Sequence, residues 1–297
     1  MNRSSLVHEW MVRNAGALCC PVCGGALGTR DAGSVRCAVG HSFDISSKGS
    51  LTLAQAAAPS KYDRPMLTSR RAIARSGFFD ALETALAEAL CRYLPCDEPR
   101  LLDAGCGEGS ALHSILALLA GRGRAAEAAG VDLSKEGIRL AASAYAGPLW
   151  CMADLTRLPF ANGTFHAILN ILSPTNHWEF TRVLAPGGVV LKAVPGAAYL
   201  SELRQALYGG DERESYNNDE VLRHFAQGFE LLERRLVRAE VSIPAALWPD
   251  LIAMTPLTWP ADEERRANLL AHPQPSVTAE WLLLVGQPRH PISSDSC

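Results

Sequence analysis

Strand-like and helix-like segments alternate from residue 100 onward, and this order constrains the fold more than any other feature of the chain. The expected strands are RLLDAG, AEAAGVDL, PLWCMAD, HAILNIL and GGVVLKAV, and the helices between them include SALHSILALLA and SKEGIRLAASAY. This alternation predicts an α/β fold with a mostly parallel sheet covered by helices on both faces. Two later strands, FELLERRLVRAEVSI and VTAEWLLLVGQ, are expected to pair as an edge hairpin and to bring the sheet to seven strands.

The composition is that of a globular protein, with 48% hydrophobic and 20% charged residues. No apolar run approaches the roughly 18 residues that a membrane span needs. The first residues, MNRSSLVHEWMVRN, lack the apolar stretch of a secretory signal. We therefore expect a cytoplasmic protein with no membrane partner, in a compartment where thiols stay reduced.

Changes in composition divide the chain into three expected parts. Residues 1–55 hold a Cys- and Gly-rich stretch with short alternating segments, which indicates small strands and turns. Residues 56–99 begin as a linker and continue with the apolar spacing of two helices, broken near Ser76 and Gly77. Residues 100–297 form the α/β domain.

Four residues in the first part have the spacing of a metal site, C-x2-C-x13-C-x3-H, formed by Cys20, Cys23, Cys37 and His41. Two residues between thiolates suit a tight turn that points both sulfurs at one ion, and Cys3His is a regular structural zinc set. The alternatives are ordinary buried thiols or a redox pair, although no strand leads into a helix here as in redox folds. Cys19 is the spare cysteine, because only Cys20 gives the two-residue spacing.

A glycine-rich turn joins the first strand of the α/β domain to its helix. Glycines there let the backbone approach a ligand, to which the free N–H groups at the helix start point. Acidic residues precede this turn and end the second and third strands, where they could accept hydrogen bonds from a nucleoside. The residues concerned are Asp103, Gly105, Gly107, Gly109, Asp132 and Asp154. An NAD-binding unit is the alternative interpretation.

The front of the chain is basic although the whole chain carries a net charge of −3. Residues 1–75 contain ten Lys or Arg and four Asp or Glu, a net of +6 that leaves −9 for the remainder. Five of these cations fall within fifteen positions: Lys61, Arg64, Arg70, Arg71 and Arg75. Such a cluster indicates either an anionic partner or a solvated helix face.

Residues 100–195 resemble the class I S-adenosylmethionine (SAM) methyltransferases, a Rossmann-like fold. The resemblance implies that Asp103 and the glycine turn face the methionine part of SAM. It also implies that Asp132 holds the ribose hydroxyls and that Asp154 holds the adenine amine.

Nearly the whole chain resembles the bacterial 23S rRNA (guanine-N1)-methyltransferases, a zinc-containing group that includes tylosin and mycinamicin resistance enzymes. The stretches that carry this resemblance include CPVC, RCAVGHSFDISSKGSLTL, MLTSRRAIARSGFF, DAGCGEGS and AMTPLTW. The resemblance implies zinc at the Cys3His set and an rRNA hairpin loop held between the zinc module and the catalytic domain. The group's dimeric habit suggests a homodimer, and a macrolide-resistance role is a further expectation.

An RNA substrate would use the basic cluster for phosphate contacts and aromatic side chains for base stacking. The stacking candidates are Trp178, Phe180, Trp248 and Trp259, of which Trp259 is preferred because it lies in a Pro-flanked loop. We expect Asn170, Ser173 and Pro174, after the fourth strand, to orient the guanine edge. No general base is named, although His177 is one candidate for accepting the N1 proton.

Two other functions remain open on sequence grounds. A small-molecule SAM-dependent methyltransferase would use the zinc knuckle only for structure. A non-catalytic zinc-dependent RNA-binding protein would retain a degenerate SAM fold.

Overall fold

A computed structural model describes residues 3–31, 33–54, 63–94, 98–209 and 217–289. Lys61 and most of the expected linker lie outside these residues. None of the described helices is long and apolar enough to cross a membrane.

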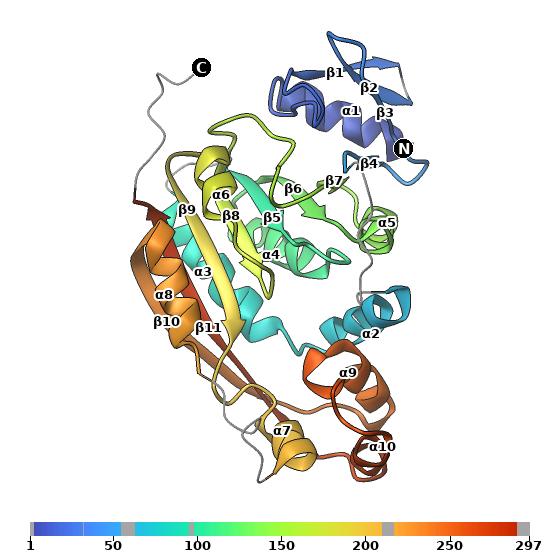
Figure 1. Ribbon diagram of the computed structural model, residues 1–297, viewed down its shortest axis with the longest axis vertical. Helices are drawn as coiled ribbons and strands as arrows, with labels where there is room; N and C mark the ends of the chain where they lie inside the picture. Colours follow the sequence, from blue (N-terminus) through green and yellow to red (C-terminus); the bar gives the residue numbers. More distant parts are fainter. Residues whose placement is uncertain (1–2, 32, 55–62, 95–97, 210–216, 290–297) are drawn as a thin grey trace.

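The N-terminal part forms a small module at one end of the molecule (Figure 1). Helix α1 (Arg3–Arg13) precedes a three-stranded antiparallel sheet in the order β1-β2-β3. These strands are β1 (Leu27–Asp31), β2 (Ser34–Cys37) and β3 (Ser42–Asp44). The next strand, β4 (Ser50–Thr52), leaves this sheet and pairs in parallel with the central sheet.

The central sheet has eight strands in the order β10-β11-β9-β8-β5-β6-β7-β4. The strands are β5 (Arg100–Ala104), β6 (Glu127–Asp132), β7 (Leu149–Met152), β8 (Phe165–Ile171), β9 (Leu184–Pro195), β10 (Phe229–Val241) and β11 (Val277–Pro288). Strands β4 to β9 run parallel, and β11 runs antiparallel between β9 and β10, as the expected hairpin requires. The mostly parallel class I methyltransferase fold is thus confirmed. The sheet has one strand more than expected, because β4 of the N-terminal module pairs with β7.

Helices cover one face of this sheet and bury the larger core against it. They are α2 (Arg64–Arg75), α3 (Asp80–Tyr93), α4 (Ser110–Ala120), α5 (Lys135–Ala144), α7 (Ser201–Tyr208), α9 (Trp248–Met254) and α10 (Glu263–Ala271). The break between α2 and α3 falls at Gly77, which has a positive φ of 85°, as its sequence position predicts. Helix α2 begins where Asp63 accepts a hydrogen bond from the Met66 N–H at 3.0 Å.

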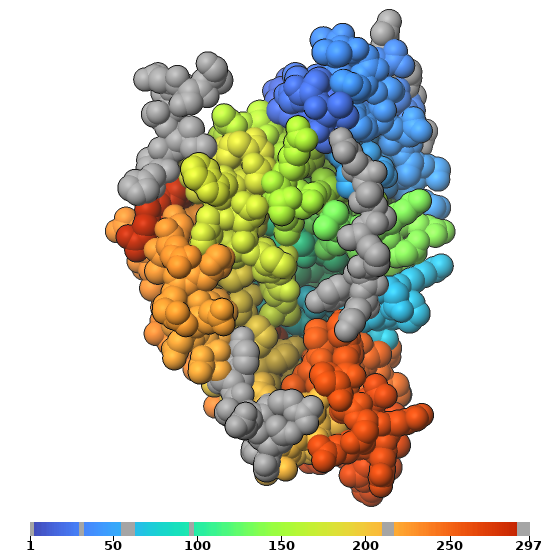
Figure 2. Space-filling model, viewed as in Figure 1, coloured from blue at the N-terminus to red at the C-terminus, as the bar shows by residue number. Residues whose placement is uncertain are grey.

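The opposite face is covered by α6 (His177–Val183), by α8 (Asp219–Gly228) and by the N-terminal module itself. Val7, Trp10 and Leu18 of the module are buried in one cluster with Val131 and Phe160 of the α/β domain. The module therefore shares a hydrophobic core with the sheet, and Figure 2 shows the two in direct contact. Burial of this shared apolar surface stabilises both parts together.

Candidate metal centre and cofactor cavity

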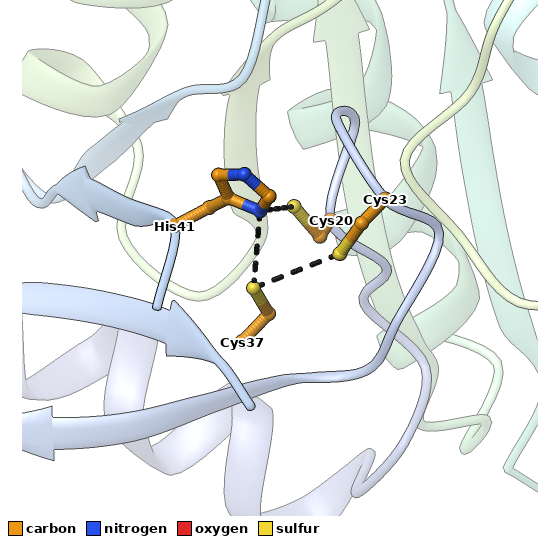
Figure 3. A group of neighbouring side chains, drawn as sticks. All are labelled: Cys20, Cys23, Cys37 and His41. Carbon is orange, nitrogen blue, oxygen red and sulfur yellow. Dashed lines mark hydrogen bonds between the residues drawn. The ribbon is translucent and has the colours of Figure 1, made fainter. Parts of the chain in front are cut away.

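The side chains of Cys20, Cys23, Cys37 and His41 converge at one point of the N-terminal module (Figure 3). The Nδ1 atom of His41 lies 3.6 Å from the Cys20 Sγ and 3.4 Å from the Cys37 Sγ, and the Cys23 and Cys37 sulfurs are 3.7 Å apart. Ligands at ordinary zinc distances around a tetrahedral ion lie roughly 3.5–3.8 Å from one another. The donor set and its spacing therefore fit a zinc ion.

Two turns build this metal centre. Cys20 and Cys23 lie on a tight turn, where the Gly24 N–H donates to the Cys20 carbonyl at 2.8 Å and Gly24 has a φ of 76°. Cys37 ends β2 and His41 precedes β3, so a hairpin supplies the second pair. Cys19 is not part of the cluster, and its N–H donates to the Pro159 carbonyl at 3.0 Å.

A cavity of about 400 Å³ opens at the carboxyl ends of the parallel strands, where α/β folds bind ligands. Its walls come from α2, the glycine turn, the ends of β6 and β8, and the segment after β7. The lining residues include Arg70, Gly105, Gly107, Asp132, Asp154, Ser173 and Pro174. The fold thus brings most of the expected cofactor and substrate residues to one place.

The three glycines of the turn have positive φ angles but different surroundings. A Cβ atom on Gly105 would overlap the Ser173 hydroxyl, so this glycine allows the Ser173 side chain to pack against the turn. Both Gly105 and Gly107 line the cavity. A Cβ atom on Gly109 would instead meet Trp150 and Ala141, so this glycine serves the packing of α4. Only the first two glycines of the turn line the cavity.

Two carboxylates at the strand ends line the cavity and are held by backbone donors. Asp132 accepts the Gly107 N–H at 2.8 Å and the Ser134 N–H at 2.7 Å, while burial raises its pKa. Asp154 accepts the Thr156 N–H at 2.8 Å through Oδ1. Each carboxylate oxygen has more than one lone pair, so both groups can still accept hydrogen bonds from ribose hydroxyls or an adenine amine.

Asp103 is different, because its side chain is only 1% exposed and neither of its oxygens has a hydrogen-bond partner among the described residues. Burial, together with the Asp132 charge, raises the pKa of Asp103 to about 7, and the Arg70 charge opposes this rise. A buried carboxylate without a donor is costly. The ammonium group of a bound SAM is a cation that could satisfy it, so this orphaned group fits the cofactor.

The segment after β8 forms the opposite wall of the cavity. Leu172 has a φ of 54°, which is uncommon for a non-glycine residue, and it turns the chain so that Ser173 and Pro174 line the cavity. The Asn170 side chain is 0% exposed; its Nδ2 donates to the carbonyls of Ala104 and Pro174, at 3.2 and 2.9 Å. The structure therefore does not bring the Asn170 amide to the cavity surface.

Lys192 is a buried residue of this site that sequence reasoning missed. Its ammonium donates to the Asn170 Oδ1 at 2.8 Å and to the Ser173 carbonyl at 3.0 Å, and burial lowers its pKa to about 8. A lone lysine inside the apolar strand VVLKAV was the available signal. Together, Lys192 and Asn170 hold the Ser173–Pro174 segment in place.

The arginines of α2 separate into two pairs. Arg64 and Arg75 are exposed, whereas Arg70 and Arg71 are partly buried. Arg71 donates to the Glu108 carboxylate at 2.8 Å and to the Glu108 carbonyl at 3.0 Å, which fixes α2 against the glycine turn. Arg71 is therefore occupied within the protein.

The aromatic candidates also differ in exposure. Phe180 and Trp248 are buried core residues, whereas Trp178 is 83% exposed. Trp259 is partly buried, and its Nε1 lies 3.4 Å from the Ala253 carbonyl to which it donates. His177 is stacked on His224 with ring centroids 4.3 Å apart and is not among the residues that line the cavity.

Comparisons with known proteins agree with this geometry. Residues 101–188 match the family described as methyltransferase domain. A Bacillus subtilis protein, YxjB, provisionally named a 23S rRNA (guanine-N1)-methyltransferase, is 34% identical over 273 residues, covering 90% of this chain and 95% of its own. A Micromonospora griseorubida protein with the same provisional name is 34% identical, covering 88% of this chain and 93% of its own.

A third relative, the 23S rRNA (guanine(748)-N(1))-methyltransferase of Streptomyces fradiae, is 29% identical, covering 85% of this chain and 89% of its own. The similarity to these proteins extends over the N-terminal module, the sheet and the cavity rather than over the SAM-binding strands alone. The chain belongs to the 23S rRNA (guanine-N1)-methyltransferase family of SAM-dependent enzymes.

Proposed function

We propose that this enzyme transfers the methyl group of SAM to N1 of a guanine in a hairpin loop of 23S rRNA. The observation that carries the proposal is the cavity between the glycine turn and the Ser173–Pro174 segment, which has cofactor-type polar groups on one wall. Relatives named for this reaction match the chain over most of its length, which supports the substrate class.

The cofactor would occupy the wall formed by the glycine turn and the acidic strand ends. Gly105 and Gly107 would present their backbone to it, Asp132 would accept the ribose hydroxyls, and Asp154 would accept the adenine amine. Asp103 would face the methionine end. SAM supplies an electrophilic methyl group on its sulfonium when bound.

The target guanine would lie against Ser173 and Pro174. Methyl transfer forms a bond from N1 to the methyl carbon, breaks the methyl–sulfur bond and releases the N1 proton, leaving N1-methylguanine and S-adenosylhomocysteine. The base has to leave its stack to reach the cavity, as bases do in other nucleic-acid-modifying enzymes. Lys192 and Asn170 would act as positioning residues that fix the wall against which the base is held.

Exposed cations and aromatics would bind the remainder of the RNA. Arg64 and Arg75 on α2 remain available for phosphates, and Arg36 and Lys48 are exposed on the zinc module. Trp178 and Trp259 are the accessible aromatics for base stacking, whereas Phe180 and Trp248 are buried. In this proposal the zinc ion is structural and holds the module that recognises the RNA.

Primer extension on 23S rRNA from a strain that lacks this protein tests the proposal, because N1-methylguanine stops reverse transcriptase. The stop is expected to disappear on deletion, to return with the wild-type chain and to stay absent with Asp132→Asn. A stop that persists in the deletion strain would contradict the rRNA substrate. Macrolide susceptibility of the same strains tests the resistance role separately.

A further inference from the structure

Arg70 is the one α2 arginine that lines the cofactor cavity. Its guanidinium lies over the Phe79 ring, 5.1 Å from the centroid, and the side chain is partly buried. Among the described residues it forms no ion pair, although Arg71 beside it binds Glu108. Successive helix positions point in different directions, so these two neighbouring arginines serve different purposes.

A buried acidic side chain that is not among the residues lining the cavity lies within electrostatic reach of Arg70. Asp103 is buried without a hydrogen-bond donor, and the Arg70 charge acts on the carboxyls of both Asp103 and Asp132. The Arg70 guanidinium and the Asp103 carboxylate are thus near enough to influence each other but do not form an ion pair. Two opposite charges that remain apart in a partly buried site suit a ligand that carries both charges itself.

The position of Arg70 is set by its helix and by the contact of its guanidinium with the Phe79 ring. Arg71 joins α2 to the glycine turn through Glu108, Asp63 caps the start of α2, and α9 packs against α2. A guanidinium that already packs on an aromatic ring of a fixed helix pair loses less conformational freedom on binding a ligand than one extended into solvent.

We propose that Arg70 binds the α-carboxylate of the cofactor's methionine part, while Asp103 binds its α-ammonium. The inference rests on SAM as the cofactor but not on the identity of the RNA. It moves Arg70 from the expected phosphate contacts to the cofactor site. A guanidinium suits this task because it can donate two parallel hydrogen bonds to one carboxylate.

Calorimetric titration of the zinc-loaded full chain, without RNA, tests the inference with two probes. S-adenosylhomocysteine carries the α-carboxylate, whereas decarboxylated S-adenosylmethionine keeps the amine and lacks it. Arg70→Met is expected to weaken S-adenosylhomocysteine binding roughly 10- to 100-fold, as loss of charge-assisted hydrogen bonds predicts. The affinity of Arg70→Met for the decarboxylated probe should stay within about twofold of wild type, which corresponds to a change in binding free energy of less than about 0.5 kcal/mol.

Arg75→Met is the matched control, because Arg75 is exposed on the same helix, and it should leave both affinities at the wild-type values. Arg70→Lys keeps the charge and should fall between wild type and Arg70→Met for S-adenosylhomocysteine alone. An equal loss for both probes would overturn the inference, as would no loss for either. If Arg70→Met weakened RNA binding and left S-adenosylhomocysteine binding normal, the inference would be wrong and Arg70 would be assigned to RNA phosphate contacts. None of these outcomes depends on which RNA is methylated.

Discussion

The metal centre and the cofactor cavity both place polar side chains next to a hydrophobic core, but they are built in opposite ways. The candidate metal centre gathers the ligand atoms of four side chains within 4.8 Å of one another, from two short turns. The cavity keeps its charged groups apart: Arg70, Asp132 and Asp154 line it from different segments, and Asp103 is buried without a partner and is not among the residues lining it. The first site is specified by local spacing along the chain, whereas the second is specified by how distant segments pack.

Replacing one of the four candidate zinc ligands should have the largest effect, because it tests whether the module depends on a metal ion. Cys37→Ser is expected to lose the metal and to lower the free energy of unfolding by about 5 kcal/mol, part of what structural zinc supplies. Metal analysis and chemical denaturation measure both quantities. Cys19→Ser is the control and should keep the metal, because Cys19 lies outside the cluster. An unchanged metal content in Cys37→Ser would contradict a metal site formed by these four residues.

Cofactor affinity should fall strongly when a methyl group is added to a glycine that lines the cavity. Gly105→Ala is expected to weaken S-adenosylhomocysteine binding about 100-fold, because the added methyl overlaps Ser173 and φ is 89°. Gly123→Ala controls for backbone strain, since Gly123 has a φ of 74° with nothing within 4 Å of the added carbon. The Gly123→Ala variant should lower the free energy of unfolding by about 1 kcal/mol and leave the affinity for S-adenosylhomocysteine unchanged. Equal affinities in the two variants would show that Gly105 does not face the cofactor.

The unpartnered Asp103 predicts a pH dependence of cofactor binding. Its pKa is raised to about 7, chiefly by burial and then by Asp132, with Glu108 adding to the rise and Arg70 opposing it. Only the ionised form can accept the cofactor ammonium, so affinity should fall about tenfold per pH unit below pH 7. Titration calorimetry from pH 5.5 to 8 measures this slope. Asp103→Asn should bind more weakly and without the slope, and a slope that survives in this variant would assign it to another group.

The smallest expected effect concerns RNA and distinguishes the two accessible tryptophans. Trp178→Ala should weaken binding of a 23S rRNA hairpin about tenfold, because stacking on an exposed indole contributes roughly 1–3 kcal/mol per base. Filter binding at a fixed salt concentration measures the affinity of this variant for the RNA hairpin, and the Trp259→Ala variant is measured in the same way for comparison. A loss confined to Trp259→Ala would favour the Pro-flanked loop as the stacking surface instead.

Features that depend on spacing or periodicity could be predicted from the sequence. The C-x2-C-x13-C-x3-H pattern gave the four residues that converge, because turns and a hairpin keep ligands that are close in sequence close in space. The strand and helix alternation gave the parallel sheet, and Asp132 and Asp154 line the cavity because parallel strands end at one edge.

Features that depend on helix rotation or on packing could not be predicted in this way. Arg70 and Arg71 are neighbours in the basic cluster, yet one lines the cavity and the other binds Glu108. Asn170 lies at a strand end, but the alternation of side chains turns it inward, toward Lys192. The pairing of β4 with β7 left no local signal, because three residues of strand are too few to show a pattern.

Incubation of 23S rRNA with the purified, zinc-loaded chain and SAM, followed by mass spectrometry of the nucleosides, measures the proposed reaction itself. We expect one N1-methylguanosine per rRNA, located in a hairpin loop, and none with Asp132→Asn. Methylation of another base or another guanine position, or no transfer to rRNA by a chain that binds SAM, would contradict the proposed function.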